Sequence, residues 1–238
     1  MLLEVNGVES SCQHPDPEHL VFEYMRWMRT ILGCVRPDRD AALDIAHLGG
    51  GGCSLPRALA HTYPASRHHV VEIDALLAEY VRTWFSLPRS PRVRIRVADA
   101  AEALQSWRED RFDVLVRDVF AGDRTPDSLT SVIAARHVSR VLRPDGVYLA
   151  NCATAPGVPV LADELATLAT VFPHLAVAAE PAQLSGRRRG NAVIVASHSP
   201  LPAEADRALR ADAVTVRWTQ GSTLRSLIRS GRERSGDA

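Results

Sequence analysis

Residues 43–62 read LDIAHLGGGGCSLPRALAHT. A short apolar run ends in the four glycines 49–52, and apolar residues at helical spacing follow from about residue 54 to 61. This pattern predicts a strand, then a turn whose backbone can approach a ligand closely, then the start of a helix. The turn lacks the G-x-G-x-x-G spacing, so it does not predict a pyrophosphate cradle. A tight strand–helix turn without a ligand is the alternative interpretation.

The alternation of short apolar runs with helical segments continues beyond this stretch. We expect further strands at 69–73, 93–97, 112–116 and 147–151, helices at 75–85, 100–107, 128–142 and 159–171, and two last strands at 174–179 and 191–197 that pair antiparallel. Such alternation predicts right-handed βαβ units. The predicted fold is therefore α/β: a three-layer, Rossmann-like, seven-stranded, mostly parallel sheet with an antiparallel last strand.

Both ends of the chain differ from this pattern. Asn6-Gly7 is a tight-turn dipeptide, and Asp16-Pro17-Glu18 is typical of a helix start. The last residues, RSGRERSGDA, show no apolar periodicity. We therefore divide the chain into a short N-terminal hairpin and helix (1–38), a Rossmann-like nucleoside-binding domain (39–228) and a disordered tail (229–238).

Composition narrows the classes of function. The 28 basic and 28 acidic residues cancel, which predicts no nucleic-acid partner, and the absence of lysine excludes Schiff-base and P-loop lysine chemistry. The four cysteines form no C-x-x-C pair, so we expect neither a metal site nor a disulfide framework. Without a long apolar run or a basic leader, we expect no membrane association and a cytoplasmic location.

Carboxylates follow three of the predicted strands. In open α/β sheets, ligands bind beyond the carboxyl ends of the strands, where the strand order reverses. Glu72, about two dozen residues after Gly49, is placed to accept ribose hydroxyls, whereas Asp74 is expected to cap the next helix. Asp99 could accept from an adenine amine or cap a helix. Asp118 could orient and deprotonate an attacking amine, or it could be a loop aspartate held by backbone amides.

Blocks of this sequence resemble the polyamine aminopropyltransferases of the spermidine synthase family, in particular a shortened spermidine-synthase-like branch. The blocks are HLGGGGCSLPRALAHTYP, VVEIDALL, RVADAAEAL, FDVLVRDVF and VLRPDGVYLAN, and they span roughly residues 40–152. The resemblance implies the class I S-adenosylmethionine-dependent methyltransferase fold. It also implies transfer of an aminopropyl group from decarboxylated S-adenosylmethionine to an amine acceptor, with no metal.

Position by position, the resemblance implies roles for individual residues. The nucleoside donor is expected to contact the backbone of the glycine turn, the acid after the second strand with its neighbour, and the residues that open the helix after the third strand. The residues are Gly49, Gly50, Gly51, Gly52, Glu72, Ile73, Asp99 and Ala100. Asp118 matches the aspartate that helps to deprotonate the amine, and it also lies beside the donor.

Two positions depart from the family pattern. Gly52 stands where the family usually has an aspartate near the aminopropyl amine, and the loop after Asp118 carries Phe120 and Arg124 in place of a second carboxylate unless Asp123 takes that role. These departures leave two alternatives open: an S-adenosylmethionine-dependent methyltransferase acting on a small molecule, and a non-catalytic nucleoside-binding protein. In either transferase reading the acceptor is a small molecule, and a homodimer is expected because relatives of this fold often dimerise.

Three other side chains carry simpler expectations. Cys53 at a helix start could have a lowered pKa, although no general base is evident beside it in the sequence. His68 and His69 at the start of the second strand are expected to be exposed polar residues, not metal ligands.

Overall fold

The computed structural model describes residues 2–5, 8–122, 124–157 and 159–236. The strands are β1 (Leu2–Val5), β2 (Val8–Cys12), β3 (Asp44–Leu48), β4 (Arg67–Glu72), β5 (Val93–Val97), β6 (Phe112–Arg117), β7 (Leu142–Thr154), β8 (His174–Ala179), β9 (Gly190–Ser197) and β10 (Arg217–Thr219). The helices are α1 (Glu23–Val35), α2 (Ser54–Thr62), α3 (Ala75–Trp84), α4 (Ala100–Ser106), the short 3₁₀ helix η1 (Asp127–Leu129), α5 (Val132–Val141), α6 (Val160–Ala169), α7 (Pro181–Leu184), α8 (Ala205–Leu209) and α9 (Gly221–Ser230).

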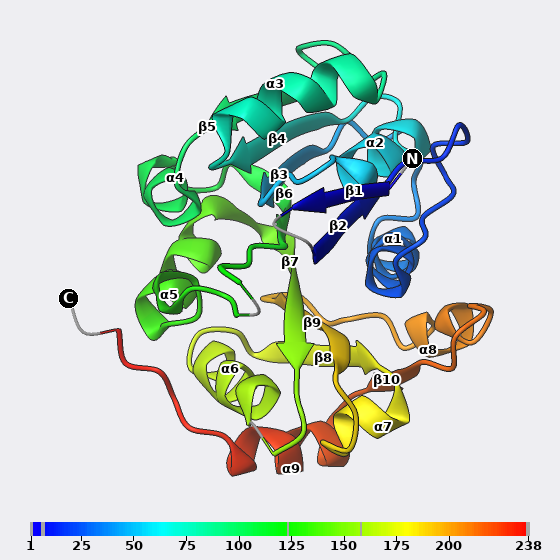
Figure 1. Ribbon diagram of the computed structural model, residues 1–238. Coiled ribbons are helices and arrows are strands. Elements are labelled where there is room, and N and C mark those ends of the chain that lie inside the picture. Colours follow the sequence, from blue (N-terminus) through cyan, green and yellow to red (C-terminus); the bar gives the residue numbers. More distant parts are fainter. Residues whose placement is uncertain (1, 6–7, 123, 158, 237–238) are drawn as a thin grey trace.

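One large sheet organises the molecule (Figure 1). Its eight strands run in the order β10-β8-β9-β7-β6-β3-β4-β5. Strands β3 to β7 are parallel, and β9 lies antiparallel between β7 and β8. The predicted α/β class and the antiparallel pairing of the last two expected strands are confirmed. The expected number of seven strands is wrong, because the three-residue β10 adds an edge strand that is too short to show a periodic pattern.

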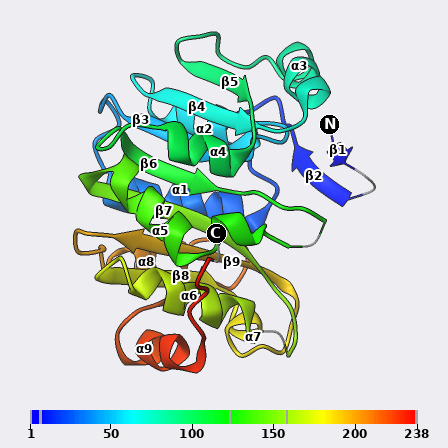
Figure 2. The ribbon, with the colours of Figure 1, turned by 90° about the vertical axis from the view of Figure 1, so that its left-hand side faces the viewer.

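Helices cover both faces of this sheet. Figure 2 shows α4, α5 and α6 on the near face, with α1 and α2 behind the strands. Alternate side chains of each strand serve the two layers: Ala46 and Leu48 of β3 join the core under α4 to α6, and Ile45 joins the core under α1 and α2. Buried on both faces, the central strands read as apolar runs, which is why the sequence located them well.

The N-terminal segment is part of this structure. Strands β1 and β2 form an antiparallel pair, and the predicted Asn6-Gly7 turn lies outside the described residues. The helix expected from Asp16 begins only at Glu23, because the Asp16 carboxylate accepts from the nearby Glu18 amide in a local turn. Trp27 of α1 is fully buried against the sheet. The division between an N-terminal segment and a nucleoside-binding domain at residues 38 and 39 remains a prediction.

The C-terminal segment also makes contacts. Residues 229 and 230 end α9, and the backbone amides of Arg232 and Arg234 donate to Asp163 and Thr167 of α6. This differs from the disordered tail expected from residue 229, because composition shows a lack of apolar burial but not the acceptors that α6 offers. Residues 237–238 lie outside the described ranges. Among the helices described, none is long and apolar enough to cross a membrane.

His68 lies inside the sheet, contrary to expectation. It is fully buried; its Nδ1 lies 3.0 Å from Nε2 of the buried His47, and its Nε2 lies 2.8 Å from the Ser66 hydroxyl. Burial lowers the pKa of His68 to about 3 and that of His47 well below its usual value. The side chains of His47, His68 and Ser66 therefore satisfy one another instead of facing solvent.

Candidate functional site

The carboxyl end of β3 runs into the glycine turn at the point where the strand order reverses, since β3 pairs with β4 on one side and β6 on the other. Gly49 has a φ of +85°, and a Cβ there would lie 2.2 Å from the Asp118 carbonyl oxygen. A Cβ on Gly50 would lie 2.7 Å from Cγ1 of Val70. The turn therefore needs glycine so that the backbone can lie against β4 and the end of β6.

Glu72 closes this turn from the end of β4. Its Oε2 accepts from the amides of Gly50 at 3.1 Å and Gly51 at 2.8 Å, and its Oε1 accepts from the Asp74 amide at 3.0 Å. These bonds fix the direction of the carboxylate, which has further lone pairs for hydroxyl donors. Asp74 caps α3 through the Leu77 amide, as predicted. The structure thus brings together Gly50, Gly51 and Glu72.

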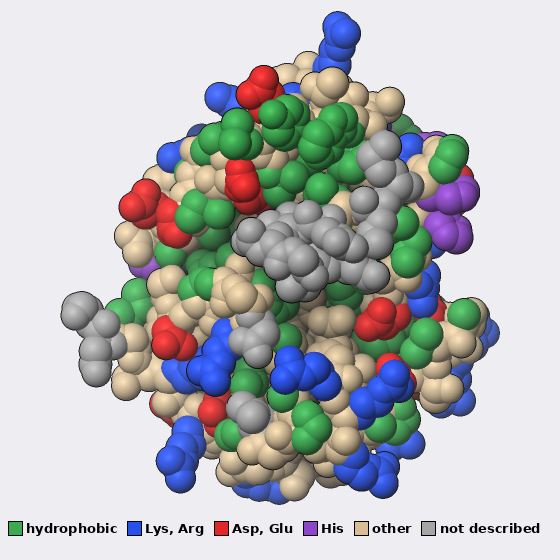
Figure 3. Space-filling model, viewed as in Figure 1, with side chains coloured by type: hydrophobic (Ala, Val, Ile, Leu, Met, Phe, Trp, Pro, Cys, Tyr) green, Lys and Arg blue, Asp and Glu red, His purple; other side chains and the backbone are tan. Residues whose placement is uncertain are grey.

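Apolar side chains lie exposed next to Glu72. Ile73 is 69% exposed, and Val97 at the end of the neighbouring β5 is 52% exposed. Figure 3 shows hydrophobic side chains gathered over α3, where Leu76, Tyr80 and Trp84 are also exposed. This surface is chemically suited to the flat ring of a nucleobase, and the contact predicted for Ile73 remains a prediction.

Asp99 is an N-cap in this structure. Its Oδ1 accepts from the amides of Ala101 at 2.8 Å and Glu102 at 3.1 Å, so it stabilises the start of α4. Asp99 is exposed and Ala100 is buried. The capping alternative is therefore correct, and the predicted adenine contacts of these two residues stay predictions.

Asp118 lies just beyond β6 and receives two side-chain hydrogen bonds. The Tyr24 hydroxyl of α1 donates to Oδ2 at 2.8 Å, and Nδ2 of Asn151 in β7 donates to Oδ1 at 2.9 Å. Burial raises the pKa of Asp118, and the two hydrogen bonds and the Arg117 charge oppose that rise. The structure therefore favours neither a loop aspartate held by backbone amides nor a side chain turned out to solvent.

Sequence reasoning did not identify Tyr24 or Asn151 as site residues. Tyr24 lies four residues from Leu20 and from Met28, a spacing that is typical of the buried face of a helix. Asn151 ends the strand expected at 147–151, so the rule that pointed to Asp118 could have found it. Burial raises the pKa of Tyr24 far above its usual value, with a further contribution from Asp118. Tyr24 therefore stays protonated and acts as a donor.

A second carboxylate lies beside Tyr24 on α1. Oε1 of the partly buried Glu23 accepts from Nδ2 of Asn191 in β9 at 3.3 Å. Asn191 pairs with Ala153, near the carboxyl end of β7. The predicted alternative, Asp123, lies outside the described residues, and Phe120 in the same loop is 37% exposed.

Gly52 contacts the N-terminal hairpin. Its amide donates to the Ser11 hydroxyl at 2.8 Å, its carbonyl accepts from Gln13 at 2.6 Å, and a Cβ at this position would lie 2.5 Å from the Ser11 Cβ. The space for the family's aspartate side chain is therefore filled by β2. The neighbouring Cys53 differs from expectation, because burial raises its pKa to about 12 and no thiolate forms at neutral pH.

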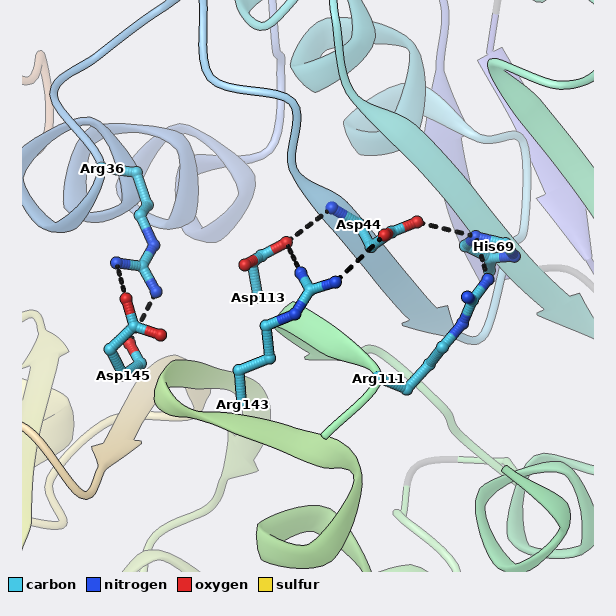
Figure 4. Close-up of polar contacts among 7 residues, drawn as sticks. All are labelled: Arg36, Asp44, His69, Arg111, Asp113, Arg143 and Asp145. Carbon is cyan, nitrogen blue, oxygen red and sulfur yellow. Dashed lines mark hydrogen bonds and ion pairs between the residues drawn. The ribbon is translucent and has the colours of Figure 1, made fainter. Parts of the chain in front are cut away.

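An ion-pair network lies at the amino ends of the strands, opposite the candidate site (Figure 4). Arg143 pairs with Asp113 and with Asp44, and His69 contacts Asp44 at 3.4 Å and Arg111 at 3.3 Å. Positive and negative groups alternate here, which is typical of a structural network. Within the described ranges, no group of three or more His, Cys, Asp or Glu side chains could hold a metal ion.

The chain is similar in structure and in sequence to known proteins. A crystal structure of a probable spermidine synthase from Corynebacterium glutamicum ATCC 13032 superimposes with a TM-score of 0.94 and 38% identity, covering 100% of this chain and 88% of that one. The polyamine aminopropyltransferase of Vibrio vulnificus (strain CMCP6) is 28% identical over 145 residues, 59% of this chain. The eEF1A lysine and N-terminal methyltransferase of Bos taurus is 31% identical over 146 residues, 57% of this chain.

These relatives are transferases of two kinds. The aligned part is 47% of the aminopropyltransferase and 20% of the methyltransferase, so this chain corresponds to only a portion of either protein. No family model matches the sequence. The match to the Corynebacterium protein nevertheless extends over the whole chain at well above 30% identity. The fold, the glycine turn with its strand-end carboxylates and this full-length similarity together show that the chain belongs to the spermidine synthase family.

Proposed function

We propose that this protein is a transferase that binds an S-adenosylmethionine-type nucleoside and moves an aminopropyl group from its decarboxylated form to a small amine. The observation that carries the proposal is the placement of Asp118, whose carboxylate is held by Tyr24 and Asn151 beside the glycine turn. Membership of the spermidine synthase family supports it.

The donor is assigned to the glycine turn and its neighbours. Glu72, already oriented by two turn amides, accepts from the ribose hydroxyls, and the exposed Ile73 contacts the base. Asp99 presents its carboxylate near the base while it caps α4. With no metal in this scheme, the activated sulfonium supplies the leaving group.

The reaction is a direct substitution at carbon. The lone pair of the acceptor amine attacks the propyl carbon that is bonded to sulfur, the C–S bond breaks, and its electrons remain on the sulfur of methylthioadenosine. The new ammonium group then loses one proton, which the Asp118 carboxylate accepts and passes to water. Holding the two reactants in line supplies much of the rate. The partly buried Asp118 carboxylate has a raised pKa, which suits a base.

Glu23 supplies a second carboxylate on the acceptor side of this scheme. Its side chain is held by Asn191 and precedes Tyr24 on α1. A cationic amine loses hydration when it enters a partly buried site, and carboxylates offset that cost. Glu23 and Asp118 together favour an acceptor that carries a positive charge in addition to the neutral amine that attacks.

One observation favours the second candidate, methyl transfer from S-adenosylmethionine itself. Gly52 places no carboxylate near the donor tail, and Ser11 fills the space that such a side chain would take. A donor that keeps its own carboxylate would meet less repulsion there. The similarity to the eEF1A methyltransferase accords with this alternative.

Product analysis separates the two reactions. The full chain is incubated with either donor and a panel of amines, and methylthioadenosine and S-adenosylhomocysteine are quantified by chromatography. Methylthioadenosine release that depends on an amine and is lost in Asp118→Asn supports aminopropyl transfer. Asp113→Asn, near the other end of the preceding strand β6, is the control. Release of S-adenosylhomocysteine moves the assignment to methyl transfer.

Calorimetry tests the nucleoside site independently of the reaction. Methylthioadenosine and both donors are titrated into the wild-type protein and into Glu72→Ala. We expect binding that the substitution weakens by at least about tenfold, since two hydroxyl hydrogen bonds are lost. If none of the three nucleosides binds the wild-type protein, both transferase assignments are wrong.

A further inference from the structure

The interior of the sheet contains an ion pair directly beside Asp118. Arg117, the last residue of β6, is 0% exposed, and Glu164 of α6 is 2% exposed. Nη1 of Arg117 and Oε1 of Glu164 lie 2.6 Å apart. Sequence reasoning identified neither residue, because one lies in an apolar strand and the other in a helix with ordinary acidic content.

The arginine also holds the strand that supplies a partner of Asp118. Nη2 of Arg117 donates to the Asn151 carbonyl at 2.9 Å, and the Asn151 side chain donates to Oδ1 of Asp118 at 2.9 Å. Arg117 is therefore linked to Asp118 twice, through the peptide bond and through Asn151. Glu164 holds the other terminal nitrogen of the guanidinium, Nη1.

Stability does not account for this pair. Among the described residues, Nε of Arg117 has no hydrogen-bond partner. Burying two charges with incomplete hydrogen bonding costs free energy that well-packed apolar side chains would not cost. Tyr148 and Cys152, which also lie near the pair, are buried and neutral, with pKa values raised mainly by burial. Packing therefore does not explain why a charged pair is buried at this position.

We infer that Arg117 and Glu164 are positioning residues, which hold Asn151 and the end of β6 so that the Asp118 carboxylate points at the acceptor amine. The inference rests on the proposed function for its catalytic consequence, but the coupling of the pair to Asp118 can be measured without any reaction. Among the described residues, the titratable or charged groups that act on Asp118 or on Tyr24 are Arg117 on β6 and, on α1, the neutral hydroxyl of Tyr24 with the Glu23 carboxylate beside it.

The test removes the pair without leaving a lone buried charge. In Arg117→Met/Glu164→Leu, the Asp118 carboxyl is titrated by NMR in aspartate-labelled protein, its signal being the one that disappears in Asp118→Asn. We expect the midpoint to rise by about one pH unit, because the nearest positive charge is gone. The turnover number for the product is expected to fall about tenfold, with the KM for the amine changed much less.

The network of Figure 4 supplies a matched control. Asp113→Asn/Arg143→Met removes an ion pair at the other end of the same strand, and we expect it to leave the Asp118 midpoint and turnover unchanged. Arg117→Lys keeps the charge but loses the planar donor fork. It should keep the midpoint near the wild-type value while turnover falls. This variant also provides a test if the double variant does not fold.

The outcomes separate the two claims. A folded Arg117→Met/Glu164→Leu variant with unchanged Asp118 titration and turnover would overturn the positioning role. A shifted titration in a protein that shows no activity with either donor would leave the coupling of the pair to Asp118 standing, and the proposed function would fail alone.

Discussion

The Tyr24 hydroxyl donates a 2.8 Å hydrogen bond to Oδ2 of Asp118 across 94 residues of sequence. This contact joins α1, an N-terminal element, to the end of β6 in the centre of the sheet. It gives the N-terminal segment a direct part in the candidate site. With the Asn151 amide on the other oxygen, the carboxylate is held from two sides.

Removing this hydroxyl should reduce turnover. In Tyr24→Phe, Asp118 loses one of two donors, so its orientation loosens and its pKa rises further, because the hydrogen bond lowers it. We expect a turnover number lower by about tenfold in the product assay and little change in nucleoside binding by calorimetry. Tyr63→Phe, which removes a hydroxyl that donates to the Arg36 carbonyl at 2.8 Å beyond the other end of α1, should keep the wild-type turnover number. An unchanged turnover number for Tyr24→Phe would count against a role for this contact.

Gly52 should tolerate no side chain while Ser11 is present. A Cβ at position 52 would lie 2.5 Å from the Ser11 Cβ, so Gly52→Ala should lower the free energy of unfolding by about 1–3 kcal/mol. Ser11→Gly/Gly52→Ala should recover part of that loss, because the colliding atoms are removed. Thermal unfolding of the two single variants and the double variant measures the coupling. Additive effects would show that the hairpin does not pack against the turn in solution.

Two substitutions of Asp99 distinguish its capping role from a contact with the nucleoside. Asp99→Ala should cost about 1 kcal/mol of unfolding free energy through loss of the cap, whereas Asp99→Asn should keep the cap. Asparagine replaces the second acceptor oxygen with an NH₂ donor, which would oppose the adenine amine. We therefore expect Asp99→Asn to weaken methylthioadenosine binding about tenfold without changing stability. Binding equal to the wild type would leave Asp99 with the cap alone.

The buried histidines predict a stability that depends on pH. The pKa values of His47 and His68 are lowered in the folded state, so the unfolded chain binds more protons below its ordinary histidine pKa of about 6.5. The stability that depends on keeping these two histidines neutral is fully present above pH 6.5. It is lost progressively as the pH falls toward their pKa values in the folded state. Urea unfolding at pH 7.5 and pH 5 should show the loss, and His68→Gln should reduce the difference between the two. His61→Gln, at an exposed histidine, is the control and should not.

Much of the central sheet could be predicted because its strands are apolar runs separated by helical periodicity. Glu72 and Asp118 were found for a related reason: the ends of parallel strands meet at one edge, so position in sequence implies position in space. The late start of α1 and the short β10 were missed, since a local turn at Asp16 and a three-residue strand leave no periodic signal.

The sequence by itself determined the α/β class, the glycine turn and the order of the strand-end carboxylates, because these depend on local periodicity and on the rule of strand ends. Only the tertiary structure decided which groups surround Asp118. Tyr24, Asn151, and the Arg117–Glu164 pair come from α1, β7, β6 and α6. Their meeting depends on how distant elements pack across the sheet, and a buried tyrosine or arginine carries no local pattern that distinguishes a site residue from a core residue.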